Sequence, residues 1–146
     1  MSDVNVKKPG VLFWVLGAVF LIWNLFGCII YYMDMTMSYD AYVKSYGEEM
    51  AQVREFYPTW SVAAYAIAVW GGLLAAILYL LKKKWAAPLF VISLICAIIS
   101  FIWGFTNADY KAAAGGAFWV MPVIVVVLGI FEVWWSRKKS AQGILS

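Results

Sequence analysis

Long apolar stretches separated by short polar segments dominate the pattern along this chain. Four apolar runs occupy residues 11–32, 60–81, 85–105 and 117–135. Each run is close to the ~20 residues that an α-helix needs to cross ~30 Å of hydrocarbon. None alternates between apolar and polar residues as a membrane β-strand does. The pattern therefore predicts an all-α fold, an integral membrane four-helix bundle formed as a single domain by residues 1–146.

The composition agrees with this pattern and excludes several classes of protein. Hydrophobic residues make up 65% of the 146 residues and charged residues only 13%, and the mean hydropathy is +0.82. A soluble domain is typically about half apolar and about a quarter charged, and the few polar residues here could not cover so much apolar surface. We therefore expect the lipid bilayer as surroundings, and we exclude a soluble domain, a disordered chain and a nucleic-acid-binding protein.

The basic residues predict the orientation of the four spans. Eight of the eleven lysines and arginines lie before the first span, between the second and third spans, or after the fourth span: Lys7, Lys8, Lys82, Lys83, Lys84, Arg137, Lys138 and Lys139. Loops on the cytoplasmic side carry an excess of basic residues. We therefore expect a multi-pass protein of the bacterial inner (plasma) membrane with both termini in the cytoplasm.

The segment between the first two spans, residues 33–59, has the pattern of an amphipathic helix. From Tyr39 to Tyr57, tyrosine and aliphatic residues recur at three- and four-residue steps, and charged residues fall on the opposite side. Ser38 is a suitable residue to cap the start of this helix. We expect a short extracytoplasmic helix that lies on the membrane or caps the bundle. In the other loop on this side, residues 106–116, a Gly-Gly pair predicts a turn.

Small residues predict where the spans pack. Helices in lipid gain little from burying apolar side chains against each other, so close packing depends on small residues. In the second and third spans such residues recur at four-residue steps and form the predicted packing face: Ala64, Ala68, Gly72 and Ala76, with Cys96, Ser100 and Gly104. This face serves either packing within the chain or contact with a second copy or another membrane protein.

Polar residues inside membrane spans are candidates for functional sites. Asn24 lies near the centre of the first span beside Trp23, and is either a hydrogen-bonded packing contact or part of a polar site. With Tyr65 and Trp70 of the second span, these residues form a candidate intramembrane site for a small polar solute. Glu132, the ionisable residue within the fourth span, is expected to form an ion pair with Arg137 at the inner interface.

The residue types limit the chemistry that we expect. The chain has no histidine, and the sequence shows no acid–base pair, no nucleophile with a base and no cluster of metal ligands. We therefore expect a non-enzymatic protein without cofactor or metal. The first hypothesis is a protein that acts through helix packing, as an oligomer or as an accessory subunit of a membrane complex. The alternative is an oligomeric carrier for a small neutral polar solute such as a sugar, since four short helices leave one copy little room for a central site.

Several segments carry a resemblance to a family. They are Trp23-Asn24-Leu25-Phe26-Gly27 in the first span, and Pro58-Thr59-Trp60, Ala66-Ile67-Ala68-Val69-Trp70-Gly71-Gly72 and Lys82-Lys83-Lys84-Trp85-Ala86-Ala87-Pro88-Leu89-Phe90-Val91-Ile92-Ser93-Leu94 further along. Together they resemble a group of small bacterial four-span inner-membrane proteins, commonly labelled hypothetical proteins or candidate sugar transporters. The similarity covers the first three spans better than the fourth. It implies a four-helix membrane fold and transport as a function, but assigns no residue to a substrate.

Overall fold

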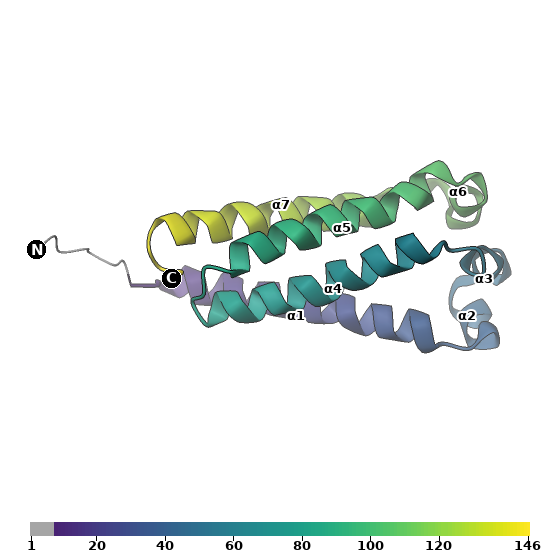
Figure 1. Ribbon diagram of the computed structural model, residues 1–146. Helices are drawn as coiled ribbons and strands as arrows, with labels where there is room; N and C mark the ends of the chain where they lie inside the picture. The colour runs from purple at the N-terminus through teal and green to yellow at the C-terminus, as the bar shows by residue number, and fades with distance from the viewer. Residues whose placement is uncertain (1–7) are drawn as a thin grey trace, which may run out of the picture.

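The computed structural model describes residues 8–146, and over this range the chain forms helices and no strands. Four helices are long and apolar enough to cross a membrane, namely α1 (Val11–Thr36), α4 (Thr59–Leu80), α5 (Ala86–Thr106) and α7 (Val120–Ala141). The prediction of an all-helical chain with four candidate spans is therefore confirmed. In space the helices follow their order along the chain, because α1 packs on α4, α4 on α5 and α5 on α7 (Figure 1).

Small residues face the neighbouring helices, and large apolar residues face outward. The residues of the predicted packing face in α4 are all buried: Ala64, Ala68, Gly72 and Ala76. This stripe packs against α1 and α5 of the same chain. Outward-facing side chains such as Ile22, Ile67 and Val127 are half exposed or more, as expected of side chains that face lipid. The packing stripe on the second span is thus occupied within the chain.

Two serine hydroxyls join α4 to α5. Ser93 Oγ donates a hydrogen bond of 2.6 Å to the carbonyl oxygen of Ala68, and Ser61 Oγ donates one of 3.2 Å to the carbonyl oxygen of Ser100. Hydrogen bonds between helices in a membrane contribute about 0.6–2 kcal/mol each. These bonds therefore fix the register of the tightest helix pair in the bundle.

Short helices cover one end of the bundle, which we call the loop end: α2 (Tyr39–Tyr46), α3 (Glu48–Arg54), α6 (Ala108–Ala114) and the 3₁₀ helix η1 (Gly115–Ala117) (Figure 1). Ser38 caps α2, as predicted, because its side chain accepts a hydrogen bond from the Ala41 amide. The prediction of one continuous helix from Tyr39 to Tyr57 is wrong. Gly47 lies at φ 92°, a conformation that side chains with a Cβ rarely adopt, and it separates α2 from α3.

The second loop contains a helix where the sequence predicts only a turn. Asn107 Oδ1 accepts a hydrogen bond of 2.8 Å from the Tyr110 amide, which is the geometry of an N-cap, and α6 follows. The Tyr110 ring then lies over Gly104 of α5, where a Cβ atom would come within 2.9 Å of it. This close contact holds α6 against α5, and the chain turns at Gly115 with φ 77°.

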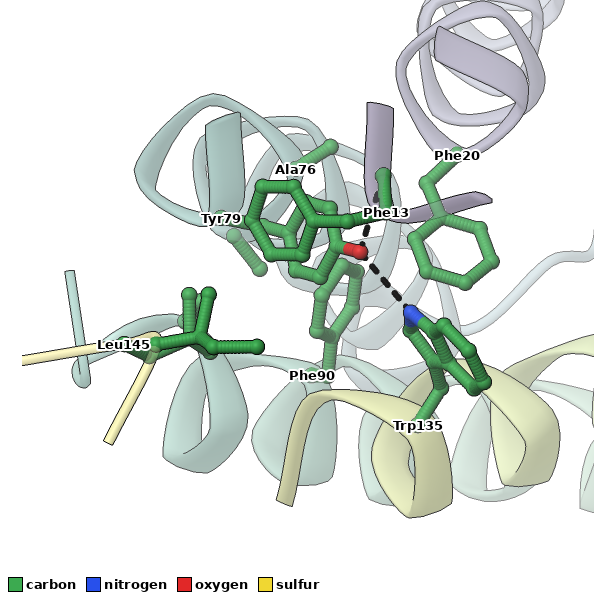
Figure 2. Close-up of a cluster of buried hydrophobic side chains, with 10 residues drawn as sticks. Phe13, Phe20, Ala76, Tyr79, Phe90, Trp135 and Leu145 are labelled. Atoms are coloured by element: carbon green, nitrogen blue, oxygen red, sulfur yellow. Dashed lines mark hydrogen bonds between the residues drawn. The ribbon is translucent and has the colours of Figure 1, made fainter. Parts of the chain in front are cut away.

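At the opposite end, which we call the terminal end, aromatic side chains fill the space between the helices. Tyr79 of α4 is fully buried, and its ring stacks on Phe13 of α1 with 4.3 Å between centroids. Its hydroxyl donates a hydrogen bond of 3.0 Å to the Phe13 carbonyl and accepts one of 2.8 Å from Trp135 Nε1 of α7 (Figure 2). Phe20 and Phe90 complete this cluster. Tyr79 thus links three of the four long helices through one side chain.

The C-terminal residues close the terminal end further. Gly143 lies at φ 77°, and the chain after it turns back, so that Ile144 and Leu145 are buried in the same cluster. The Ser146 amide donates to the Lys82 carbonyl at 2.9 Å. The start of α1 and the C-terminus both lie at this end of the bundle (Figure 1). Of the predicted basic cluster, Lys7 lies outside the described residues.

Replacing Tyr79 with Phe should destabilise the protein by about 1–3 kcal/mol, because the buried Trp135 indole N–H then loses its acceptor. The measurement is the midpoint of thermal unfolding in detergent micelles, which should fall. Tyr32→Phe is the matched control, since Tyr32 is 64% exposed and the same chemical change there should leave the midpoint in place. Equal midpoints for the two variants would contradict the role assigned to Tyr79.

Candidate functional site

A polar pair joins the first and last long helices in the middle of the bundle. Asn24 Nδ2 of α1 donates a hydrogen bond of 2.7 Å to Glu132 Oε2 of α7, and another of 2.8 Å to the Phe20 carbonyl. Asn24 is only 8% exposed and Glu132 only 5%. Burying such groups away from water is costly unless they are hydrogen-bonded. The pair therefore draws α1 and α7 together at this depth.

Gly72 of α4 provides the space for the Asn24 amide. A Cβ atom at position 72 would collide with Asn24 Oδ1 and would lie 3.0 Å from Ser93 Oγ. The neighbouring Gly71 has nothing within 4 Å of its Cβ position. Of these two consecutive glycines, only Gly72 is therefore required by packing. Because it has no side chain, the Asn24 amide of α1 and the Ser93 hydroxyl of α5 can lie beside the α4 backbone.

A cavity of about 530 Å³ extends from this pair toward the loop end. All four long helices line it, with Trp23, Asn24 and Ile30 from α1, Ser61 and Tyr65 from α4, Ser93, Ala97 and Trp103 from α5, and Val125, Gly129 and Glu132 from α7. Most of these side chains are apolar or aromatic, and the few polar ones are hydroxyls, the amide and the carboxylate. A volume of ~300–1,000 Å³ with this kind of lining is typical of small-molecule sites.

Aromatic and charged residues form the roof of the cavity at the loop end. The Tyr57 ring packs edge-on against Trp103, with 4.6 Å between centroids. The Arg54 guanidinium lies 4.5 Å from the centre of the Tyr42 ring and donates a hydrogen bond to the Met37 carbonyl. Arg54 is thus held by contacts within residues 37–54, and the roof presents mainly rings to the cavity.

The tyrosines of the roof remain neutral at physiological pH. Burial, followed by the nearby Asp34 carboxylate, raises the pKa of Tyr42 to about 12. Burial also raises the pKa of Tyr57 and of Tyr110. These phenols therefore offer hydroxyl groups and ring faces to a bound molecule, and no negative charge of their own.

The cavity is closed at the terminal end. Phe90 belongs both to the lining of the cavity and to the aromatic cluster around Tyr79, so its ring lies between the two. Toward the loop end, α1 lies apart from α7 (Figure 1), whereas near Phe90 their rings meet, with 5.9 Å between the centroids of Phe20 and Phe131. The space within the bundle is therefore a pocket with a floor, and the Asn24–Glu132 pair lies on that floor.

The structure brings together three of the four residues of the predicted intramembrane site. Trp23, Asn24 and Tyr65 line the cavity. Trp70 is 49% exposed on the outside of α4 and is not among the lining residues. Small residues of the predicted packing face also border the cavity, namely Ala68, Ser100 and Gly104, whereas Cys96 lies half-buried elsewhere. The packing face and the candidate site are thus parts of one interior.

Glu132 lies in a different environment from the one that the sequence suggests. The predicted ion pair with Arg137 is replaced by the hydrogen bond from Asn24, and Arg137 is exposed. Five residues along an α-helix correspond to a rotation of about 140°, so the two side chains leave α7 in different directions. The spacing itself is a signal, because helical ion pairs form at i,i+3 or i,i+4. Glu132 therefore belongs with Asn24 in the candidate site.

The remaining chemistry of the described residues is sparse. Within residues 8–146, no three Cys, Asp or Glu side chains come close enough together to hold a metal ion. Cys28 Sγ donates a hydrogen bond to the Val69 carbonyl at 3.1 Å, which joins α1 to α4. The polar floor and the aromatic walls of the cavity are therefore the features with which a ligand could interact.

Gly72→Ala should destabilise the protein by about 1–3 kcal/mol, because the added methyl group forces the Asn24 amide out of its position. Gly71→Ala is the matched control and should leave stability within about 1 kcal/mol of the unchanged protein, since alanine favours a helix over glycine and the space is open there. The measurement is again the thermal midpoint in micelles. A larger loss at position 71 than at position 72 would contradict the geometry of the pair.

Comparisons of the chain with protein-family models, with curated proteins and with solved structures found no match. The cavity and its lining form a small-molecule-sized pocket, which has a hydrogen-bonded amide and carboxylate at its floor and is lined by four helices of membrane-spanning length.

Proposed function

We propose that the protein is a membrane carrier that binds a small solute in the cavity between its four long helices. The observation that carries this proposal is the cavity of about 530 Å³ that reaches the buried Asn24–Glu132 pair. Leaving space inside a helix bundle forfeits packing energy. A bundle that acted only through contacts with other helices would gain stability by filling this space with larger side chains.

The volume of the cavity affects how many copies of the chain a carrier would need. The sequence suggests that a carrier needs at least two copies because four short helices leave little room. A cavity within one chain that falls in the range of small-molecule sites removes that reason. Association with itself or with other membrane proteins stays a prediction, and the small-residue stripe that suggested it is occupied by α1 and α5 of the same chain.

We also propose an orientation in a bacterial inner membrane, with the terminal end in the cytoplasm. Lys8, the loop of residues 82–84 and the segment of residues 137–139 lie at the ends of helices on that side, as the positive-inside rule requires. In this orientation α2, α3 and α6 are extracytoplasmic. The cavity then faces the outside of the cell, and the aromatic cluster around Tyr79 seals the cytoplasmic side.

The lining defines the kind of solute in general terms. Aromatic and aliphatic walls suit an apolar or ring-shaped body, and the polar floor suits a hydrogen-bonding group at one end of it. A sugar-like solute, which the family resemblance implies, would meet the rings of Trp23 and Tyr65 with its ring and the Asn24–Glu132 pair with its hydroxyls.

Thiol labelling tests whether the cavity is open to water from the side of the loop end. In a chain with Cys28→Ala and Cys96→Ala, a Val125→Cys variant should react with a membrane-impermeant methanethiosulfonate reagent added from outside, because Val125 lines the cavity. The matched control is Ile124→Cys, since Ile124 is 42% exposed on the outer face of α7 and would face lipid. If both thiols failed to react, the cavity would be closed to solutes and the carrier proposal would fail.

Uptake into proteoliposomes tests the function itself, with a panel of monosaccharides, polyols, aromatic amines and aromatic acids. Any solute that is taken up should lose at least about tenfold in rate with Asn24→Leu, because the floor loses its amide. Trp70→Leu removes a predicted site residue that lies outside the cavity and should leave uptake unchanged. Uptake that survives Asn24→Leu but not Trp70→Leu would place the site elsewhere.

A further inference from the structure

We infer that the cavity binds a monovalent organic cation with an aromatic or aliphatic body, and that the positive group lies against Glu132 on the cavity floor. This inference rests on the proposed function, and it names the class of solute. Three independent features of the described residues carry it: the environment of the Glu132 carboxylate, the walls above it, and the distribution of charge at the loop end.

Within the described residues, the Glu132 carboxylate has a hydrogen bond but no countercharge. Asn24 donates to Oε2, whereas no donor among residues 8–146 reaches Oε1, which is not sealed from the cavity. Glu132 itself lines the cavity, so Oε1 has access to that space. A buried carboxylate without a cationic partner is costly. A cation that enters the cavity would provide the missing partner.

The basic residues within the described range, 8–146, lie elsewhere or are already engaged. Arg54, which lines the roof, donates to the Met37 carbonyl and lies over the Tyr42 ring. Arg137 is exposed on another side of α7. No lysine or arginine among residues 8–146 forms an ion pair with Glu132. Glu132 therefore has no basic partner within the described part of the chain.

The walls above Glu132 suit an organic cation better than a hydrated inorganic ion. Trp23, Tyr65, Phe90 and Trp103 present rings to the cavity, and the faces of such rings attract ammonium groups. Between floor and roof the remaining polar groups are few, so a small metal ion would find little to replace its hydration shell. An ammonium group carried on an apolar or aromatic body would satisfy both the carboxylate and the walls.

The charge at the loop end favours the entry of cations. Residues 33–59 and 106–116 carry six carboxylates, Asp34, Asp40, Glu48, Glu49, Glu55 and Asp109, against three basic side chains, Lys44, Arg54 and Lys111. The whole chain has a net charge of +3, so the acidic excess is confined to the end toward which the cavity extends. A charge distribution of this kind raises the local concentration of oppositely charged solutes.

The test compares two compounds of the same shape that differ in charge. Benzyltrimethylammonium carries a permanent positive charge, and neopentylbenzene is its neutral carbon analogue. Titrations of the full chain in lipid nanodiscs, followed by tryptophan fluorescence, should show saturable binding of the cation and at least about tenfold weaker binding of the neutral analogue. Because this comparison uses the unchanged protein, it does not depend on any variant folding. Equal affinities would overturn the inference.

Variants of single carboxylates test which of them the bound cation contacts. Glu132→Gln keeps an acceptor for Asn24 but removes the negative charge, and it should weaken binding of the cation at least about tenfold. Asp34→Asn removes the other carboxylate that lines the cavity, and Glu55→Gln removes an exposed one. Asp34→Asn should weaken binding less than Glu132→Gln does, because Asp34 lies at the roof, and Glu55→Gln should bind the cation within about twofold of the unchanged protein. If Asp34→Asn lost binding while Glu132→Gln kept it, the cation would lie at the roof and the inference would be overturned.

Failure of this inference is distinguishable from failure of the proposed function. If Val125→Cys reacts with the thiol reagent and a neutral solute of the panel is taken up, while benzyltrimethylammonium does not bind, the carrier proposal stands and the cation inference falls. If Val125→Cys is unreactive and neither compound binds, both fall.

Discussion

The hydrogen bond between Asn24 and Glu132 is the interaction on which the interior of this protein depends. The four long helices pack in sequence, each against the next along the chain, and that arrangement alone would leave the first and last helices free of each other. An amide and a carboxylate cannot be left unsatisfied in an apolar bundle, so their pairing draws α1 to α7. Because Gly72 has no side chain, the Asn24 amide can lie against α4 at the same depth.

The two ends of the bundle differ in packing: side chains are closely packed at the terminal end, and a cavity lies toward the loop end. At the terminal end, the Tyr79 hydroxyl is hydrogen-bonded between Phe13 and Trp135, and the returning residues Ile144 and Leu145 are buried in the same cluster (Figure 2). At the loop end, α1 and α7 diverge (Figure 1), and short helices with tyrosine rings cover the opening. The polar pair lies at the boundary between the packed half and the hollow half. The result is a cavity that is closed at one end and has the volume of a small-molecule site.

The candidate site has the mixed character of many small-molecule sites, mostly apolar with a few placed polar groups. Its unusual element is a carboxylate that has an amide donor but no basic partner within the described residues. In lipid a charged group of this kind is expensive. The acidic excess of the loop end and the aromatic walls point to the same class of solute as the carboxylate does, although they arise from separate parts of the sequence.

The number of spans, their approximate limits and the small-residue stripe of α4 could be read from the sequence, because hydropathy and length alone decide whether a helix can cross a bilayer. Ser38 as a cap and Asn24 as a buried polar residue could be read in the same way, since both follow from local chemistry. The break at Gly47 and the helix after Asn107 depend on backbone conformations that periodicity does not report. The pattern of apolar and polar residues therefore predicted one long helix where α2 and α3 are separate, and it did not predict α6.

Only the tertiary structure decided what Glu132 faces and whether space remains beside it. A residue's neighbours along its own helix suggested Arg137, but the rotation of α7 relative to α1 turned the carboxylate toward Asn24, 108 residues away in the chain. The same packing left Trp70 on the outside and Tyr65 on the cavity. Apart from the small-residue stripe of α4, which side of an apolar helix faces lipid is set by its contacts with the other helices, and hydropathy that is similar on every side does not indicate it.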